Sequence, residues 1–250
     1  MESNKGARPF TVIIPNRFED IIQPLLKSIK RFEDPSTHIL IVADNHTRSY
    51  GHDLLPMTTP FIYGRSANAG IKKSSPADVI LLNDDVTLLQ PNTFAQMARI
   101  ANSDPLIGIL TPQVDGGCGN LFMRPSHTEL WEDHRRSVRN GLHYCCCRSG
   151  DSVTFACVYI KRKVFDNIGL FDENFTAYGF EDTDLCRRAS NRGFHVVVTN
   201  KLKVRHGAGG EKFVRGKNWN TSFKRIGNCN SKQNLAYLMS KQSSNGNQLN

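Results

Sequence analysis

Residues 79–86 read Val79-Ile80-Leu81-Leu82-Asn83-Asp84-Asp85-Val86. The apolar run at the start of this stretch is bounded by polar residues, which predicts a short buried strand. The carboxyl end of that strand places Asp84 and Asp85 at the edge of a sheet, where open α/β folds bind their ligands. Adjacent carboxylates repel each other, and a divalent cation, which prefers oxygen ligands, is the usual way to stabilise them. Two interpretations stay open here: a metal site for a phosphate-bearing substrate, or an aspartate-rich turn.

Strands and helices alternate on both sides of this stretch. Apolar runs predict further strands at 10–15, 38–43, 61–63, 106–110, 153–160 and 195–198. The spacing of apolar residues and the turn residues predict helices at 18–31, 66–74, 91–102, 163–168 and 183–192, and a weak one around Leu235, Leu238 and Met239. Such alternation predicts an α/β fold with a mixed, mostly parallel sheet and helices on both of its faces.

Length and composition restrict the class of protein. The 250 residues are enough for one large α/β domain or two small ones. No apolar run approaches the ~20 residues that span a bilayer, and residues 1–9 lack the apolar stretch of a signal peptide. The seven cysteines are an odd number and three of them, at 145–147, are consecutive, which suits reduced thiols better than a disulfide framework. We therefore expect a cytoplasmic protein, in the host cytoplasm if the source is a virus.

Positive charge is concentrated at the carboxyl end of the chain. The chain has 32 Lys and Arg against 23 Asp and Glu, a net charge of +9. Residues 201–250 contain ten of the basic residues and a single acidic one, Glu211, so this segment accounts for the whole net charge. The asymmetry indicates a polyanionic partner or, less in keeping with the sequence, an anionic membrane surface, and its alternative is a solvated basic tail.

A second acidic group lies in the C-terminal half. Residues 178–184 read Tyr178-Gly179-Phe180-Glu181-Asp182-Thr183-Asp184. A carboxylate at a helix start is often only an N-cap, and Asp184 fits that role. Three carboxylates are more than a cap requires, so one of them is a candidate base beside a metal or phosphate site. His206 follows the last predicted core strand, where a histidine is either structural or a metal ligand.

The order of these motifs resembles the nucleotide-diphospho-sugar glycosyltransferases of the GT-A (Rossmann-like) fold, closest in style to family 2. The resemblance covers about residues 11–206. The matching stretches are Thr11–Pro15, Ile41–Asn45, Ser66–Gly70, Asn83–Asp85, Phe165–Glu173 and Phe180–Arg187, followed by His206. The chain departs from the family at Asn83, where the commoner metal motif begins with an aspartate, and after Pro15, where the usual turn looks shortened.

The resemblance implies a role for each of these residues. It implies metal ligation by Asp85 and His206 with help from Asp84, and contacts to the sugar nucleotide from Pro15, Asp44, Arg65, Asn68, Asn83 and Asp84. It implies that Asp182 is the base for the acceptor hydroxyl and that Glu181 orients acceptor or sugar. The cofactor would be Mn²⁺ or Mg²⁺, and imidazole with carboxylate suits Mn²⁺ better. One base facing one anomeric carbon implies a single displacement with inversion.

The same resemblance divides the chain. We expect a glycosyltransferase domain at 1–210, with a nucleotide-sugar-binding half at 1–112 and an acceptor and catalytic half at 113–210, and a basic polar extension at 211–250.

The acceptor stays open at this point. Basic residues mixed with Asn, Gln and the aromatic Trp219, Phe223 and Tyr237 fit contacts to phosphates and bases, which favours a polyanion such as hydroxymethylated viral DNA. The alternative acceptor is an envelope polysaccharide or lipid-linked glycan, and the donor in both cases is a nucleotide sugar, with UDP favoured. A non-catalytic module that binds nucleotide sugars or nucleic acid is the alternative from another class. A nucleotidyltransferase would carry a glycine-rich loop after the first strand, and residues 15–20 contain no glycine.

Overall fold

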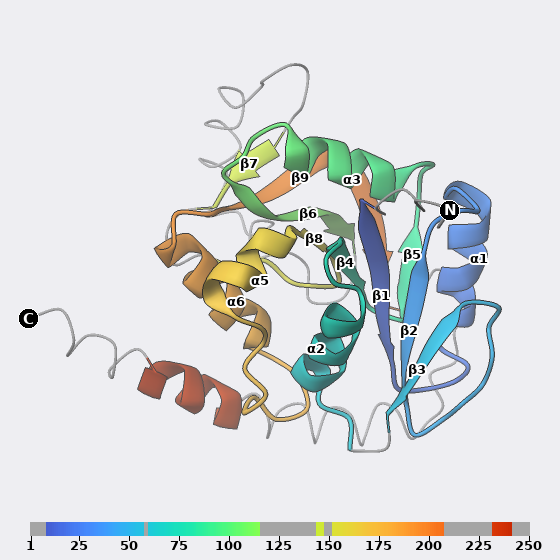
Figure 1. Cartoon of the computed structure of the whole chain (residues 1–250), viewed down its shortest axis with the longest axis horizontal. Helices are drawn as coiled ribbons and strands as arrows, with labels where there is room; N and C mark the ends of the chain where they lie inside the picture. Colours follow the sequence, from blue (N-terminus) through green and yellow to red (C-terminus); the bar gives the residue numbers. More distant parts are fainter. Residues whose placement is uncertain (1–8, 58–59, 116–143, 148–151, 208–231, 242–250) are drawn as a thin grey trace, which may run out of the picture.

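The computed structural model describes residues 9–57, 60–115, 144–147, 152–207 and 232–241 (Figure 1). Its strands are β1 (Phe10–Asn16), β2 (Ile39–Asp44), β3 (Asp53–Met57), β4 (Asp78–Leu82), β5 (Val86–Leu88), β6 (Ile107–Asp115), β7 (Tyr144–Cys146), β8 (Cys157–Ile160) and β9 (His195–His206). Its helices are α1 (Gln23–Phe32), α2 (Tyr63–Lys73), α3 (Thr93–Asn102), α5 (Arg162–Ile168) and α6 (Glu181–Asn191). A further helical segment covers residues 232–241.

All of these strands belong to one sheet, in the order β3-β2-β1-β4-β8-β6-β9-β5, with β7 paired to β9. The strands β3, β2, β1 and β4 run parallel. Beyond β4 the pairs β4–β8, β8–β6, β9–β5 and β9–β7 are antiparallel, and only β6–β9 is parallel among the described residues. The predicted mixed α/β sheet is therefore confirmed, and its parallel part is the N-terminal half together with the β6–β9 pair.

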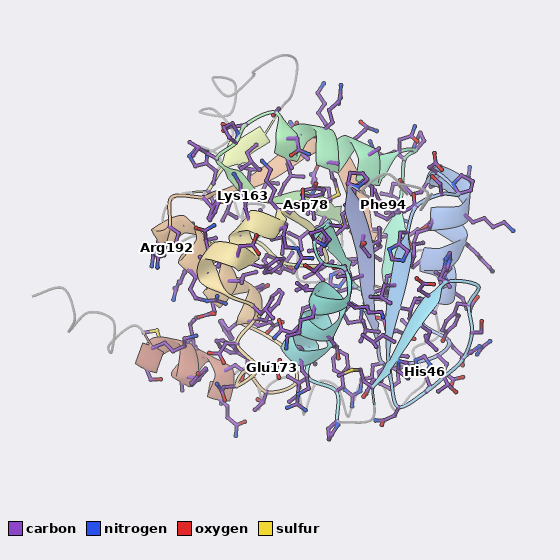
Figure 2. All side chains as sticks on the ribbon, viewed as in Figure 1. His46, Asp78, Phe94, Lys163, Glu173 and Arg192 are labelled. Carbon is purple, nitrogen blue, oxygen red and sulfur yellow. The ribbon has the colours of Figure 1, made fainter. Side chains whose placement is uncertain are left out.

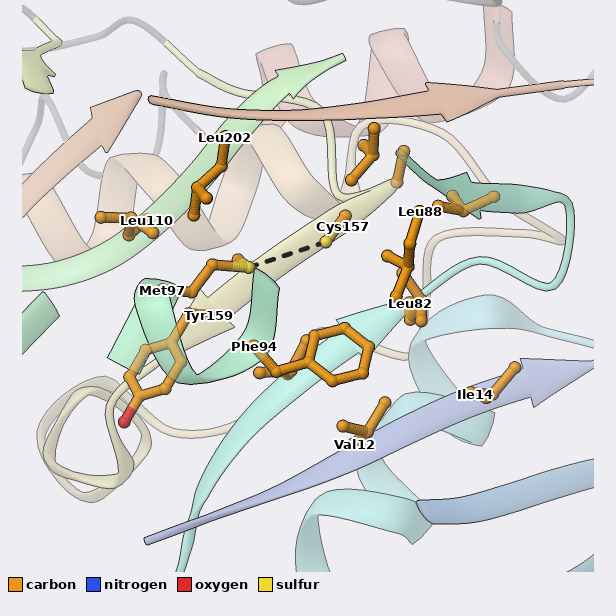
Figure 3. Packing of buried hydrophobic residues seen from close by; sticks show 14 of the residues in the cluster. Val12, Ile14, Leu82, Leu88, Phe94, Met97, Leu110, Cys157, Tyr159 and Leu202 are labelled. Atoms are coloured by element: carbon orange, nitrogen blue, oxygen red, sulfur yellow. Dashed lines mark hydrogen bonds between the residues drawn. The ribbon is translucent and has the colours of Figure 1, made fainter. Parts of the chain in front are cut away.

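Helices cover both faces of the sheet, because the buried strands present apolar side chains on both sides. On β1, Val12 and Ile14 face α1 and α3, whereas Ile13 faces α2, α5 and α6. Strands β2 and β4 alternate in the same way. Figure 3 shows the first of these two cores, in which Phe94 packs among strand residues and the sulfur atoms of Cys157 and Met97 lie 3.8 Å apart. Cys157, and Cys186 in the second core, are fully buried and form no disulfide.

The helix α2 lies very close to the sheet at one glycine. A Cβ on Gly70 would stand 2.4 Å from Cγ2 of Ile13 and 3.2 Å from Cγ2 of Val42. A side chain at this position would therefore push α2 away from β1 and β2. The close approach fixes the C-terminal half of α2 against the middle of these two strands.

Some predicted elements differ from the structure. The strand predicted at 61–63 is wrong, because α2 already begins at Tyr63 and the third strand is β3, at 53–57. Among the described strands, β3 pairs with β2 alone, and such an edge position tolerates Pro56 and half-exposed residues, so it carries no apolar pattern. The short strands β5 and β7 were not predicted, and β9 extends to His206 instead of ending at 198.

The predicted C-terminal extension is described only in part. Residues 211–231 and 242–250 lie outside the described residues, as do residues 116–143 and 148–151. The weak helix predicted around Leu235 is present at 232–241, and Leu238 is buried. Among the described helices, none has both the length and the apolar character needed to cross a membrane.

Candidate active site

The acidic pair at 84–85 stands at a turn between β4 and β5. The backbone N–H of Val86 donates to the carbonyl of Asn83 at 3.2 Å, and the N–H of Asn83 donates to the carbonyl of Ala156 at 2.9 Å. Because β5 runs antiparallel to the end of β9, Val86 is paired with His206. This register brings the distant His206 beside the turn, with its Nε2 3.2 Å from Oδ1 of Asp85.

The donor atoms at this turn fit a divalent cation. Two ligands on adjacent corners of an octahedral ion with bonds near 2.1 Å lie about 3 Å apart, which matches the separation of Asp85 and His206. Nδ1 of His206 and Oδ1 of Asn83 are buried and have no hydrogen-bond partner. Within the part of the chain that the structure describes, no three or more His, Cys, Asp or Glu side chains are grouped so that they could hold a metal. Asp85 and His206 are therefore two candidate ligands among the described residues, and metal binding by them stays a prediction.

Asp84 points away from that pair. Its Oδ2 accepts hydrogen bonds from Nδ2 of Asn16 at 2.8 Å and from the N–H of Arg17 at 3.4 Å. Burial, and then the charge of Asp85, raise the pKa of Asp84 to about 7. The structure therefore joins Asp84 to the end of β1, and a metal contact from Asp84 stays a prediction.

The carboxyl ends of β1, β2 and β4 are adjacent and form the predicted nucleotide end of the site. Pro15 is paired with Val42 in the parallel β1–β2 ladder, and Asp44 is the last residue of β2. Asp44 is 8% exposed, and burial raises its pKa while the positive charge of Arg17 opposes that rise. Pro15, Asp44 and Asp84 are thus gathered at one edge of the sheet, as the sequence predicts for a ligand-binding crevice.

The second acidic pair opens α6. Oδ1 of Asp182 accepts the N–H of Thr183 at 2.7 Å, and its carboxylate also accepts the N–H of Phe155. Glu181 is 7% exposed, and its Oε2 has no partner. Burial raises the pKa of both carboxyls, and repulsion from Asp182 raises that of Glu181 further. Carboxyls with raised pKa values at a helix start, one buried and one partly buried, favour proton exchange close to neutral pH.

The two acidic groups are neighbours across one short segment. Ala156 accepts the N–H of Asn83, while the preceding residue, Phe155, donates its N–H to Asp182. The ring of Tyr63 is buried beside the same segment, and after burial itself the charges of Glu181, Asp182 and Asp84 raise the pKa of its hydroxyl. Asn83 and Asp182, which are far apart in the sequence, are therefore hydrogen-bonded to the neighbouring residues Ala156 and Phe155.

Arg65 and Asn68 lie on α2 and hold a loop. Nδ2 of Asn68 donates to the carbonyl of Phe171 and to Glu173, both at 2.9 Å, and Oδ1 accepts the N–H of Phe171 at 2.9 Å. Nε of Arg65 lies 3.4 Å from Oε2 of Glu173, which Figure 2 places beside α2. Both residues therefore help to hold this loop against α2. Their contacts with the sugar nucleotide stay predictions.

Sequence reasoning missed three residues of the site. Asn16 is fully buried and joins Asp84 to His46, whose Nε2 lies 2.8 Å from Oδ1 of Asn16. Tyr63 lies among the carboxylates described above. Asn16 directly follows a predicted strand, which is a signal that a search for polar residues at strand ends would find. His46 and Tyr63 carry no such signal, because only the fold brings them near Asp84.

Solved structures with the same fold are glycosyltransferases. The structure titled GalNAc-T7 with UDP, GalNAc and Mn²⁺ aligns with a TM-score of 0.63 and 12% identity, covering 82% of this chain and 45% of that one. S. aureus TarS, residues 1–349, aligns at 0.59 with 15% identity over 80% and 60%. Mannosyltransferase PcManGT from Pyrobaculum calidifontis, in complex with GDP-Man and Mn²⁺, aligns at 0.58 with 14% identity over 82% and 58%. The fold is that of the GT-A glycosyltransferases.

Sequence comparison then identifies the family. The model described as "Glycosyltransferase like family 2" matches residues 7–226, so the chain belongs to this family. The O-antigen biosynthesis protein RfbC of Myxococcus xanthus is 26% identical over 235 residues, and the uncharacterized protein y4gI of Sinorhizobium fredii is 26% identical over 225 residues. Each alignment covers 81% of this chain, which spans only 17% and 25% of the length of these two relatives.

Proposed function

We propose that this protein transfers a sugar from a nucleotide-diphospho-sugar, with UDP-sugar as the favoured donor, to the hydroxyl of a glycan acceptor, with inversion at the anomeric carbon. The observation that carries the proposal is that Asn83, next to the turn that holds Asp85 beside His206, and Asp182, at the start of α6, are hydrogen-bonded to the neighbouring residues Ala156 and Phe155. The structures of GalNAc-T7 with UDP and of PcManGT with GDP-Man, each with Mn²⁺, support a nucleotide-sugar donor and a divalent metal.

In this proposal the two acidic groups have different chemical roles. Asp85 and His206 would hold Mn²⁺ or Mg²⁺, and the bound ion would supply positive charge to offset the negative charge that grows on the diphosphate leaving group. Asp182 accepts the proton of the acceptor hydroxyl as its oxygen attacks the anomeric carbon. Glu181 orients the acceptor or the sugar. Asp44 and Pro15 line the nucleotide end of the site, where Asn16 fixes the orientation of Asp84.

The acceptor is proposed from one relative and from the position of the C-terminal helix. The similarity to an O-antigen biosynthesis protein favours an envelope polysaccharide. The residues predicted to contact DNA lie at 201–250, where Lys241 is paired with Asp172 and Asp184 and Tyr237 donates to Asp172. Because these two side chains are engaged by acidic groups of the protein itself, hydroxymethylated DNA is proposed only as the second acceptor. The net charge of +9 supports it.

A donor and acceptor panel tests the proposal. With Mn²⁺ present, UDP-, GDP-, CMP- and dTDP-sugars are offered with saccharide acceptors or with hydroxymethylcytosine DNA, and product is followed by mass spectrometry. We expect a UDP-sugar and a saccharide to react. Asp182→Asn should bind donor normally and lose about 10²–10⁴ in rate. Nucleotide-sugar or DNA binding without transfer or donor hydrolysis for any combination would favour the non-catalytic module instead.

A further inference from the structure

The helical segment 232–241 packs against the loop that leads into α6. Figure 1 shows this segment beside the loop between α5 and α6. The segment lies beyond residue 226, where the family match ends. Its contacts are made by one face: Asn234 and Leu238 are buried, whereas Leu235 and Met239 on the opposite face are 44% and 55% exposed.

Asn234 makes an unusual number of contacts with the loop. It is 1% exposed. Its Oδ1 accepts hydrogen bonds from the N–H of Thr176 at 2.9 Å and from Oγ1 of Thr176 at 3.0 Å. Its Nδ2 donates toward the carbonyls of Thr176, Tyr178 and Gly179 at 2.9, 3.2 and 3.0 Å. One side chain therefore contacts four backbone groups of a segment far from it in sequence, with the two hydrogens of Nδ2 shared among three carbonyls.

The backbone of this loop needs such support. Ala177, Gly179 and Phe180 all have positive φ, at 51°, 105° and 72°. For residues with a side chain this conformation is unfavourable and persists only where surrounding contacts impose it. The N–H of Tyr63 holds the other side of the loop by donating to the carbonyl of Ala177 at 2.7 Å. Phe180 directly precedes Glu181, so the path of the loop decides where the acidic pair stands.

The other end of the helical segment is fixed by charge. Nζ of Lys241 lies 2.7 Å from both Oδ2 of Asp172 and Oδ1 of Asp184, and the hydroxyl of Tyr237 donates to Asp172 at 2.9 Å. Although burial acts to raise it, hydrogen bonds led by that from Lys241 lower the pKa of Asp172 to about 2. Oδ2 of Asp184 is paired with Arg188 at 2.7 Å. These contacts tie the segment to both ends of the loop and to α6 itself.

We infer that Asn234 is a positioning residue of the catalytic site: by holding the loop 172–180 it sets the place of Glu181 and Asp182. This inference rests on the proposed function, because it assigns the positioned groups to catalysis. Asn234 touches no reacting atom. Its effect reaches the acceptor side, through the loop, and leaves the Asp85–His206 pair and the nucleotide end as they are.

Asn234→Ala tests the inference, with Gln233→Ala on the exposed side of the same helix as the matched control. Hydrogen exchange followed by mass spectrometry should show at least about tenfold faster exchange in peptides covering 172–183 for Asn234→Ala and no change for Gln233→Ala. In sugar transfer, kcat should fall about 10- to 100-fold. The donor KM and the Kd of UDP with Mn²⁺ should stay within about twofold.

Each outcome bears on the inference. Unchanged kcat overturns it, even if the melting temperature falls, because a purely structural residue would lower stability alone. An equal loss of UDP binding also overturns it, because the effect would then not be confined to the acceptor side. If the wild type transfers no sugar to any acceptor, the proposed function fails, and the exchange data still decide whether Asn234 holds the loop.

A second variant guards against misfolding of the first. Lys241→Ala removes the ion pairs at the far end of the segment and leaves Asn234 in place. It should raise exchange in 172–183 and lower kcat in the same direction by a smaller factor, while Lys241→Arg should restore both. Wild-type exchange and wild-type kcat in Lys241→Ala would contradict the inference.

Discussion

Buried polar atoms without a partner are concentrated at one place in the described structure. They are His46 Nδ1, Asn83 Oδ1, Glu181 Oε2 and His206 Nδ1. Each such atom costs about 1–3 kcal/mol of stability when it is left unsatisfied. Asn83 and His206 lie at the ends of β4 and β9, Glu181 begins α6 and His46 follows β2, so all four lie in or beside the candidate site, where a ligand would supply the missing partners. The distribution supports the site independently of the motifs.

Removal of one metal ligand tests this arrangement at the level of a single side chain. Asp85→Ala should weaken UDP binding in the presence of Mn²⁺ by more than about 100-fold, because it deletes one of the two ligands that the protein provides. Isothermal titration calorimetry measures this loss. Asp20→Ala, which changes an exposed aspartate with a side chain 88% exposed, is the control. Retained tight binding in Asp85→Ala would refute the ligand assignment.

The hydroxyl of Thr183 gives a prediction about pH. Its Oγ1 lies 3.4 Å from Oδ1 of Asp182 and helps to stabilise the charged carboxylate, while burial raises the pKa of Asp182. Thr183→Ala should therefore raise this pKa further and move the acid limb of the kcat profile up by about half to one pH unit. Thr183→Ser keeps the hydroxyl and should leave the limb in place. A shift toward lower pH in Thr183→Ala would exclude Asp182 as the base.

A site residue could be predicted from the sequence where a motif contains it, but not where only the fold brings it to the site. Asp85 and Asp182 stand at a strand end and a helix start that the sequence indicates. The contacts of Asn68 could not be predicted, because its partner, the backbone of Phe171, depends on how α2 packs. Asn234 carries no signal at all, since its partners lie 55 to 58 residues earlier in the chain.

At the scale of elements, a carboxylate that follows one helix accepts hydrogen bonds from the first turn of another helix. Glu33, which follows α1, accepts the N–H groups of Thr93 and Phe94 at 2.7 and 3.3 Å. These are among the first N–H groups of α3, which have no partner within the helix. Glu33 thus fixes α3 against the end of α1, so that both helices cover one face of the sheet.

Glu33 makes the stability of the fold depend on pH. Burial raises its pKa from 4.5 to about 7 in the folded protein. The folded state therefore binds more protons than the unfolded state between these values, and the free energy of unfolding falls as pH rises through about 7. Between pH 4 and 8, the free energy of unfolding of the wild type should fall by up to about 3 kcal/mol relative to that of Glu33→Gln.

Urea denaturation at both pH values measures this difference. Glu19→Gln changes an exposed glutamate and should show no such pH dependence relative to the wild type. A wild-type advantage over Glu33→Gln that grows toward pH 8 would show that Glu33 titrates in the opposite sense.

Long buried elements were predictable and short or exposed ones were not. The strands β1, β2 and β4 and the helices α3, α5 and α6 carry apolar runs or spacings that match their positions within a few residues. Strands β5 and β7 have three residues each, too few for a pattern. The length of β9 depends on its partners, because its polar end at Lys203–His206 is held by β5 and β6.

At the scale of the whole molecule, one sheet carries both halves of the predicted enzyme. The proposed nucleotide end lies at the parallel strands β1, β2 and β4, and the acidic pair lies beyond β8, which joins β4 to the second half. The proposed halves, 1–112 and 113–210, therefore share a continuous backbone frame. The order of motifs could predict this fold, whereas the antiparallel insertion of β8 between β4 and β6 could not be read from the strand sequences.

The buried thiols of Cys157 and Cys186 have a practical consequence. Both lie in the two cores, where burial raises their pKa far above the usual value. Only the thiolate reacts with alkylating reagents, so a maleimide should leave both untouched in the native protein and label them after denaturation. Peptide mass spectrometry over a denaturant series would then report the unfolding of each core separately, with one natural reporter on either face of the sheet and no engineered label.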